Sequence, residues 1–351
     1  MKLLEATLAR IPEPDAVAAR EVQSRLDQKT KPPGSLGRLE ELACALAALR
    51  GTADLDLPNK AMVVMAGDHG VAAQGVSAFP QEVTAQMVLN FAHGGAAINV
   101  LARQAGARVV VVDMGVKTPL APHPAVRTHR IGPGTADIAL GPAMTREDAV
   151  RALEVGIALA DELASDGVGL IGIGEMGIAN TTAASALTSA FTGRPPEEVT
   201  GRGTGIDDAA HQRKIEVIRR ALEVNRPDPS DALGTLAKLG GFEIAGLAGV
   251  VLGAAARRVP VLTDGFIATS AALSAARIAP RASHAILASH RSVEAGHRHL
   301  LDALGKRPLF DLDLRLGEGT GAALAMSFVD AAIHILREMA TFASAGVSGK
   351  A

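Results

Sequence analysis

The 351-residue chain has no tryptophan, no tyrosine and one cysteine, Cys44. A single cysteine excludes a disulfide within the chain, as is typical of proteins from a reducing compartment. The net charge is −2, with 35 basic and 37 acidic residues, which argues against a nucleic-acid or anionic-membrane partner. No apolar run approaches the ~20 residues that a membrane-spanning helix needs. We therefore expect a cytoplasmic protein without a membrane partner.

Small residues dominate instead, and short apolar runs alternate with helical patterns, which indicates a parallel α/β sheet. Each run ends in a polar or glycine-containing loop. Ligands of open α/β sheets bind outside the carboxyl ends of the strands. We therefore predict a doubly wound, mostly parallel sheet with helices on both faces and one ligand cleft at that edge. The expected strands are residues 61–66, 108–113, 168–173, 259–263 and 284–288.

The two ends of the chain lack such strands. A helix is expected over residues 36–49, after the turn Lys31-Pro-Pro-Gly-Ser-Leu-Gly37, and another over residues 322–342. Two helical ends without strands are expected to pack together beside the sheet. The sequence thus predicts a sheet domain of residues 56–316 and a small helical subdomain of residues 1–55 together with 317–351.

Glu318 lies in the motif Leu316-Gly-Glu-Gly-Thr-Gly321, before the second of these helices. Apolar and charged residues alternate over 310–316, which predicts a half-buried strand. Glycines let a backbone approach a ligand closely while the side chain between them points at it. A solvated glutamate in a glycine-rich turn is the alternative for a lone motif of this kind.

A second acidic junction places Glu175 directly after the apolar run 168–173 and Gly174. Asn180, Thr181 and Thr182 are good helix-capping residues and predict a helix over residues 183–191. A helix start that follows a glycine-containing loop is a natural phosphate or carboxylate site. Two acidic junctions at one sheet edge favour a site over two solvated turns.

Two further patterns suggest ligands. Phe79 and Gln86 are placed to hold a flat heterocycle by stacking and a hydrogen bond, although a core phenylalanine is the alternative for Phe79. Histidines are present, but none has the spacing of a known zinc motif. The pair Asp207 and Asp208 fits a helix start as well as a cation. We expect no metal and no cofactor.

Together these motifs resemble the nicotinate-nucleotide–dimethylbenzimidazole phosphoribosyltransferase family of cobalamin lower-ligand assembly. They follow the family's order over nearly the whole chain. The matching stretches are Lys31–Glu40, Gly67–Val71 through Gln86, Gly94–Asn99, Gly172–Thr182, Gly201–Gly205, Asp264–Phe266, Ser289–His290 and Arg315–Gly321.

The resemblance implies an enzyme, a pentosyltransferase that converts nicotinate mononucleotide and 5,6-dimethylbenzimidazole into α-ribazole 5′-phosphate and nicotinate. It also implies a homodimer, with Glu318 as the general base and Glu175 stabilising positive charge on the ribose. The implied base contacts are Ser77, Phe79, Gln86 and Leu316. The implied nucleotide and phosphate contacts are Gly174, Met176, Gly177, Ile178, Ala179, Asn180, Thr181, Gly203, Lys214, Asp264, Gly265 and Ser289.

Two other classes of function remain open from the residues alone. One is a metal-dependent phosphoesterase that uses Asp68, His69 and Asp208. The other is a nucleotide-binding regulator without catalytic activity.

Overall fold

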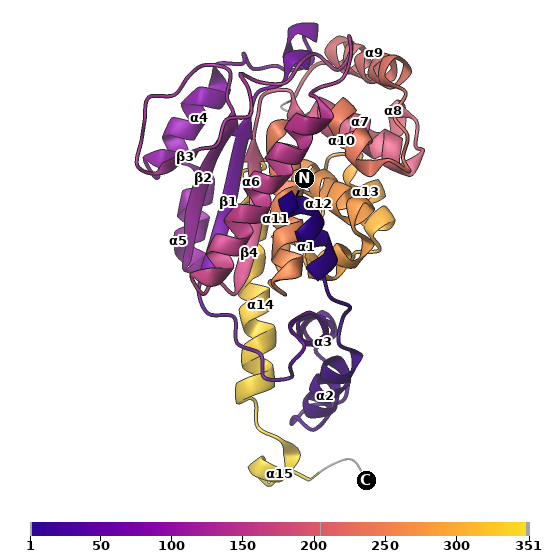
Figure 1. Ribbon diagram of the computed structural model, residues 1–351. Helices are drawn as coiled ribbons and strands as arrows, with labels where there is room; N and C mark the ends of the chain where they lie inside the picture. The colour runs from indigo at the N-terminus through magenta and orange to yellow at the C-terminus, as the bar shows by residue number, and fades with distance from the viewer. Residues whose placement is uncertain (1, 204, 349–351) are drawn as a thin grey trace.

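The computed structural model describes residues 2–203 and 205–348, so Thr204 of the glycine-rich loop lies outside the described residues. Within them the strands form one six-stranded sheet in the order β3-β2-β1-β4-β5-β6 (Figure 1). Every strand pair is parallel. The five expected strands are all present, and β3 was not predicted. The strands are β1 Lys60–Gly67, β2 Ala107–Gly115, β3 Val126–Thr128, β4 Leu170–Met176, β5 Val261–Thr263 and β6 Ile286–Ala288.

Helices cover both faces of this sheet. One face packs on α1 (Lys2–Arg10), α6 (Arg146–Ser165), α7 (Asn180–Thr192), α9 (Asp208–Asn225), α10 (Ala232–Leu239), α11 (Phe242–Ala256), α12 (Phe266–Ile278) and α13 (His297–Leu304). The other face packs on α4 (Val83–Ala92), α5 (Ala97–Ala105) and α14 (Thr320–Glu338), and α2 (Ala16–Asp27) and α3 (Arg38–Arg50) join the same apolar cluster through α14. The short helices are α8 (Pro196–Val199), α15 (Phe342–Ala345) and the 3₁₀ turns η1 (Gly70–Gln74) and η2 (Pro280–Ala285).

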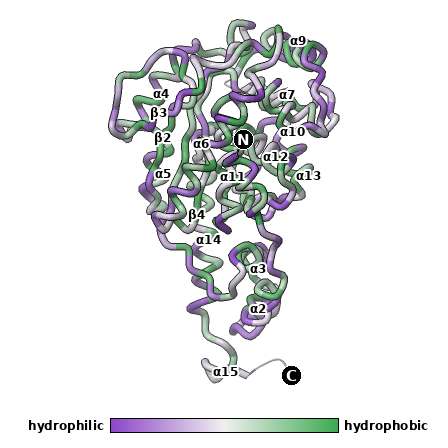
Figure 2. Tube along the Cα trace, viewed as in Figure 1, coloured by the Kyte–Doolittle hydropathy of each residue, from purple (hydrophilic) through white to green (hydrophobic). Residues whose placement is uncertain are grey.

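Strand β1 divides its side chains between the two cores. Ala61, Val63 and Met65 join one apolar cluster, and alternate residues from Met62 to Ala66 join the other. Apolar residues accordingly concentrate in the interior of the sheet body (Figure 2). Because both faces are covered, the central strands are continuous apolar runs without polar alternation. The predicted doubly wound parallel architecture is confirmed.

The helices at the two ends of the chain do not all pack together, as the predicted domain boundaries would require. Helices α2 and α3 pack on each other and on α14, beyond the end of the sheet (Figure 1). Helix α1 packs instead on α6 and α11, and Leu4 and Ile11 belong to the core of that face. Helix α14 also contacts β4 and β5. The separate helical subdomain stays a prediction. Helix α1 was predicted to belong to it but packs on the sheet-covering helices instead. Among the described helices, none combines the length and apolar character of a membrane span.

Two local predictions were wrong. Residues 310–316 do not form a strand, since Asp313 has a left-handed φ of 54° and only Phe310 makes an isolated bridge, to His290. A left-handed residue interrupts the extended backbone that a ladder requires. The helix expected from residue 183 begins at Asn180, and its cap is Ala179, which has a φ of 73° and no side-chain hydrogen bond to the helix.

Helices α6 and α11 cross at direct backbone contact. A Cβ atom added at Gly156 would overlap the carbonyl oxygen of Gly246, and one at Gly249 would overlap that of Leu153. All of α11 from Phe242 to Ala255 is buried. Glycine therefore sets the separation between α6 and α11, the helix that contacts β1, β2 and β4.

Gly156→Ala should lower the free energy of unfolding by about 1–3 kcal/mol, because overpacking outweighs the better helix propensity of alanine. Denaturant titration measures this change. Gly141→Ala is the matched control, since a Cβ there meets no atom within 4 Å. Equal stability of Gly156→Ala and the parent would contradict the close crossing.

Candidate active site

The candidate site lies where the strand order reverses. From β1 the chain winds outward to β2 and β3 on one side and then to β4, β5 and β6 on the other. The carboxyl ends of β1 and β4 flank this switch point, the usual ligand crevice of doubly wound folds. Asp68 and His69 follow β1, Glu175 lies near the carboxyl end of β4, and Asp264 follows β5.

Glu318 sits on a left-handed turn inside this crevice. Gly317, Glu318 and Gly319 have φ angles of 88°, 62° and 97°. A left-handed backbone is unfavourable for glutamate, and such strain clusters at functional sites. The side chain is buried, and its Oε2 accepts a hydrogen bond of 3.2 Å from the Ile98 amide at the start of α5. Burial raises the pKa of Glu318, and the Ile98 bond partly opposes the rise.

Glu175 faces the same turn. A Cβ added at Gly317 would lie 2.6 Å from its Oε1, so glycine is required there. The Asn180 side chain donates a hydrogen bond to Oε2 of Glu175. Burial raises the pKa of Glu175 to about 8, and the nearby carboxylates of Glu243, Asp264 and Glu318 contribute to the rise. The two acidic junctions thus form one constellation.

Asp264 holds this constellation together. Its Oδ2 accepts a hydrogen bond of 2.9 Å from the Gly319 amide, and its Oδ1 accepts one of 2.7 Å from the Gly321 amide. Burial raises the pKa of Asp264 to about 7, against the opposing backbone hydrogen bonds. A Cβ at Gly174 would overlap the backbone of Glu318 and Gly319. Gly174 and Asp264 therefore lie beneath the Glu318 turn.

The end of β6 supports β5 in a similar way. The buried Ser289 hydroxyl donates a hydrogen bond of 2.5 Å to the carbonyl oxygen of Thr263, so it is already engaged within the protein. Gly265 directly precedes α12 as its capping residue. These two predicted nucleotide residues lie at adjacent strand ends.

The predicted phosphate residues gather at the start of α7. The turn runs from Met176 and Gly177 through Ile178, whose amide donates to Thr84 Oγ1 at 3.1 Å. Thr181 Oγ1 accepts a hydrogen bond of 2.7 Å from Lys214 Nζ. A Cβ at Gly203 would lie 3.3 Å from the same Nζ. Burial lowers the pKa of Lys214 to about 8, and an anion at this position would raise that pKa again.

The predicted base residues lie at more open positions. Phe79 is 51% exposed and Leu316 is 60% exposed. Gln86 is also exposed, and Ser77 Oγ accepts a hydrogen bond of 3.3 Å from the Phe79 amide. The alternative of a core phenylalanine at position 79 is therefore wrong. Exposed apolar side chains are suited to cover a flat aromatic ligand.

The residues of the alternative phosphoesterase do not assemble. His69 Nε2 lies 2.6 Å from Glu243 Oε1, and Asp208 pairs with Arg202 on an exposed surface. Over residues 2–203 and 205–348, no three histidine, cysteine or carboxylate side chains are grouped to hold a metal ion.

Sequence reasoning missed Glu243 and the Ile98 amide. Glu243 lies inside an apolar helix, where no local pattern marks it as part of a strand-end site. The Ile98 amide belongs to the stretch Gly94–Asn99, which carried the family resemblance but no assigned role. Backbone donors have no residue signature, so only the fold reveals this one.

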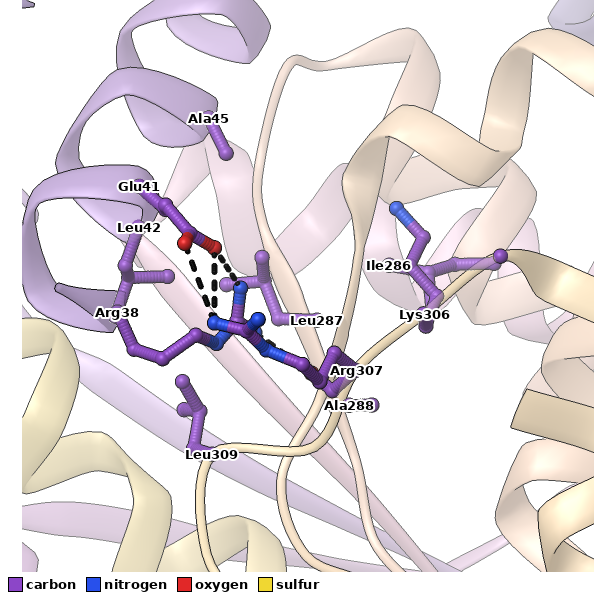
Figure 3. Close-up of a pocket in the computed structure, with 11 residues that line it drawn as sticks. Arg38, Glu41, Leu42, Ala45, Ile286, Leu287, Ala288, Lys306, Arg307 and Leu309 are labelled. Atoms are coloured by element: carbon purple, nitrogen blue, oxygen red, sulfur yellow. Dashed lines mark hydrogen bonds and ion pairs between the residues drawn. The ribbon is translucent and has the colours of Figure 1, made fainter. Parts of the chain in front are cut away.

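A separate cavity of about 420 Å³ opens between α3, β6 and the loop after α13 (Figure 3). Arg38 and Arg307 on its wall both pair with Glu41. None of the predicted site residues lines it. We therefore assign this cavity no part in the site.

Glu175 and Asp264 should make the ligand-free protein less stable as pH rises. Both pKa values are raised in the fold, so between about pH 4 and 8 the folded state binds more protons than the unfolded state, and stability falls with increasing pH. Glu175→Gln should therefore raise the melting temperature at pH 8 more than at pH 5. Glu223→Gln, at an exposed position of α9, is the control. An equal effect of Glu175→Gln at both pH values would contradict the burial of a proton there.

Comparisons with known proteins identify the family and agree with the fold. A phosphoribosyltransferase family model matches residues 11–347. The nicotinate-nucleotide–dimethylbenzimidazole phosphoribosyltransferase of Chloroflexus aggregans is 59% identical over 350 residues, covering 100% of this chain and 99% of the relative. The enzyme of the same name from Roseiflexus sp. is 58% identical with the same coverage. The crystal structure of CobT from Thermus thermophilus superimposes with a TM-score of 0.92 at 50% identity, covering 95% of this chain and all of that one. The chain belongs to the nicotinate-nucleotide–dimethylbenzimidazole phosphoribosyltransferase family.

Proposed function

We propose that this chain transfers the phosphoribosyl group of nicotinate mononucleotide to 5,6-dimethylbenzimidazole, with Glu318 as the general base. The observation that carries the proposal is the buried Glu318 carboxylate, held on a left-handed turn beside Glu175 at the switch point. The products are α-ribazole 5′-phosphate and nicotinate.

The proton balance explains the need for a base. The ring nitrogen of bound nicotinate carries a positive charge while it is joined to C1′ of the ribose. When that bond breaks, its electron pair returns to the nitrogen, and the pyridine leaves without protonation. The attacking benzimidazole nitrogen becomes cationic as it bonds to C1′, and the proton on its other nitrogen must leave. A carboxylate with a raised pKa, such as Glu318, is suited to accept it.

Glu175 has the second role. In the empty site its carboxyl retains a proton up to about pH 8. A cationic donor nearby favours the carboxylate form, because an opposite charge lowers the pKa of an acid. The resulting negative charge stabilises the positive charge that develops on the ribose during transfer. Inversion from the β-nucleotide to the α-product follows from attack on the face opposite to nicotinate.

The donor phosphate is assigned to the start of α7, with Lys214, Thr181 and Gly203. The support is the buried Lys214 ammonium directed at the helix start, where backbone dipoles also favour an anion. Gly177 is a poor probe of this assignment, since a Cβ there would overlap the carbonyl oxygen of Gly67.

Glu318→Gln should lower kcat by about 10²–10⁴-fold, because the amide keeps the shape but takes up no proton. The KM for dimethylbenzimidazole should change little. Glu175→Gln should be milder, since a dipole replaces one of several stabilising charges. Steady-state release of nicotinate measures both. Near-normal turnover of Glu318→Gln together with an inactive Glu175→Gln would exchange the two roles.

Lys214→Gln should raise the KM for nicotinate mononucleotide at least tenfold and leave the KM for the base within about twofold, since a charged hydrogen bond to phosphate is worth about 1.5–3 kcal/mol. Lys306→Gln is the matched control, because burial also lowers the pKa of this lysine, which lies in the loop after α13. Unchanged nucleotide affinity in Lys214→Gln would move the phosphate elsewhere.

We also propose a symmetric homodimer. Apolar side chains remain exposed on α14 and on the segment before it, namely Phe328, Leu312 and Leu316 at 37%, 60% and 60%. Exposed apolar side chains of this kind favour a protein partner. Light scattering at micromolar concentration should give twice the chain mass of 35.9 kDa. A monomer under those conditions would contradict the dimer.

A further inference from the structure

A buried ion pair lies next to the site without a role in the chemistry described so far. His69 Nε2 and Glu243 Oε1 are 2.6 Å apart, and their side chains are 1% and 0% exposed. His69 comes from the loop after β1, and Glu243 comes from the first turn of α11. The pair therefore joins the central strand end to the helix that supports the middle of the sheet.

Three glycines enclose the Glu243 carboxylate. A Cβ at Gly67 would lie 2.7 Å from its Oε2, and one at Gly241 would lie 2.5 Å from the same atom. A Cβ at Gly177 would lie 3.4 Å from its Oε1. The Gly67 and Gly241 backbone thus packs directly on the carboxylate. The Gly177 backbone, in the turn between Glu175 and α7, packs in turn on Gly67, since a Cβ at Gly177 would overlap the Gly67 carbonyl oxygen.

That turn carries Glu175 and its partner. The carbonyl oxygen of Gly177 accepts a hydrogen bond of 3.1 Å from the Asn180 amide, and the Asn180 side chain donates to Glu175. The path from Glu243 to Glu175 therefore passes through Gly67, Gly177 and Asn180. A shift of the Glu243 carboxylate would displace the turn that orients Glu175.

The two side chains of the pair also interact electrostatically with each other and with the carboxyls beside them. Burial alone lowers the pKa of His69, but the Glu243 carboxylate and the charge of Asp68 outweigh it, so the pKa lies above its ordinary value. The Glu243 carboxyl thus favours the protonated form of the imidazole that it contacts. Two further carboxyls face this pair, Asp68 after the end of β1 and Glu175 near the end of β4, and Glu175 in turn faces Asp264 and Glu318.

A fully buried ion pair adds little net stability, because desolvation offsets most of the attraction. Moreover, the Glu243 Oε2 and His69 Nδ1 atoms have no hydrogen-bond partner among the described residues. The pair is therefore poorly explained as a stabilising element. The role of the pair is indicated instead by the backbone turns that it contacts.

We propose that Glu243, held by His69, is a positioning residue for phosphoribosyl transfer: it supports the Gly177 turn and keeps Glu175 and Asn180 directed at the ribose of the donor. The inference rests on the role proposed for Glu175. It assigns Glu243 no contact with the substrates. Its charge also helps Glu175 to retain a proton until the cationic nucleotide binds.

The test is the pH dependence of kcat/KM for nicotinate mononucleotide, which reports ionisations of the free enzyme and free donor. The donor's own ionisations are the same for every variant and cancel in the comparison. Glu243→Gln removes a negative charge near Glu175, so the fall in kcat/KM at low pH should move to lower pH by roughly one unit. The KM for the nucleotide should rise about tenfold, and the KM for the base should stay within twofold.

His69→Gln should move the same fall to higher pH, because the amide still donates to Glu243 but removes the compensating positive charge. This variant also covers the case in which Glu243→Gln does not fold. The matched control is Asp113→Asn. Asp113 is another buried carboxylate at this edge of the sheet, bonded to the amides of Gly115 and Val116, and its variant should keep the parent profile.

The outcomes separate this inference from the proposed function. If Glu175→Gln keeps the parent profile, the fall at low pH does not belong to Glu175, and the role proposed for Glu175 in the transfer fails together with the inference. If Glu175→Gln abolishes the fall while neither Glu243→Gln nor His69→Gln moves it, only the positioning role is overturned. If Glu243→Gln and His69→Gln lower the melting temperature but keep the parent's kinetic constants, the pair has only a structural role, and the inference is overturned.

Discussion

The candidate site depends on the two hydrogen bonds that Asp264 accepts from the amides of Gly319 and Gly321. They tie the start of α14 to the end of β5 and hold Glu318 in a left-handed conformation, which costs about 1–3 kcal/mol. Hydrogen bonds to a carboxylate contribute about 1.5–3 kcal/mol each, enough to offset that strain. Gly174 completes the arrangement, because only glycine lets β4 touch the Glu318 turn. The site is thus assembled from backbone contacts between segments that are far apart in the sequence.

One electrostatic consequence follows from this assembly. Glu175, Asp264 and Glu318 are brought together in a buried space, and the pKa of each is raised. In the empty site Glu175 and Asp264 retain protons that a cationic ligand would displace. Nicotinate mononucleotide carries such a cation at the bond that must break. The donor would therefore complete the charge balance of the site, and the same charge would disappear from the ring as nicotinate leaves.

The sequence predicted the sheet and the two acidic junctions because both depend on local patterns. Apolar runs buried on two faces and glycines beside a carboxylate are visible within short stretches of sequence. Helix α1 was predicted to join the helical subdomain, but it packs on α6 and α11, because a short helical pattern does not specify which helices it contacts. The segment 310–316 alternates like a strand, yet Asp313 turns it away from any ladder. Glu243 and the Ile98 amide could not be predicted, because their place in the site comes only from the way in which helices and strand ends meet.

The most direct test of the account is whether Glu318 takes the acceptor's proton. 1-Methylbenzimidazole has no N–H, so its transfer product keeps the positive charge and no base is needed. Single-turnover rates of the parent and Glu318→Gln should be compared with this acceptor and with benzimidazole. The account predicts that Glu318→Gln is about 10²–10⁴-fold slower than the parent with benzimidazole and equally fast with the methylated acceptor. The same loss with both acceptors would contradict proton transfer to Glu318.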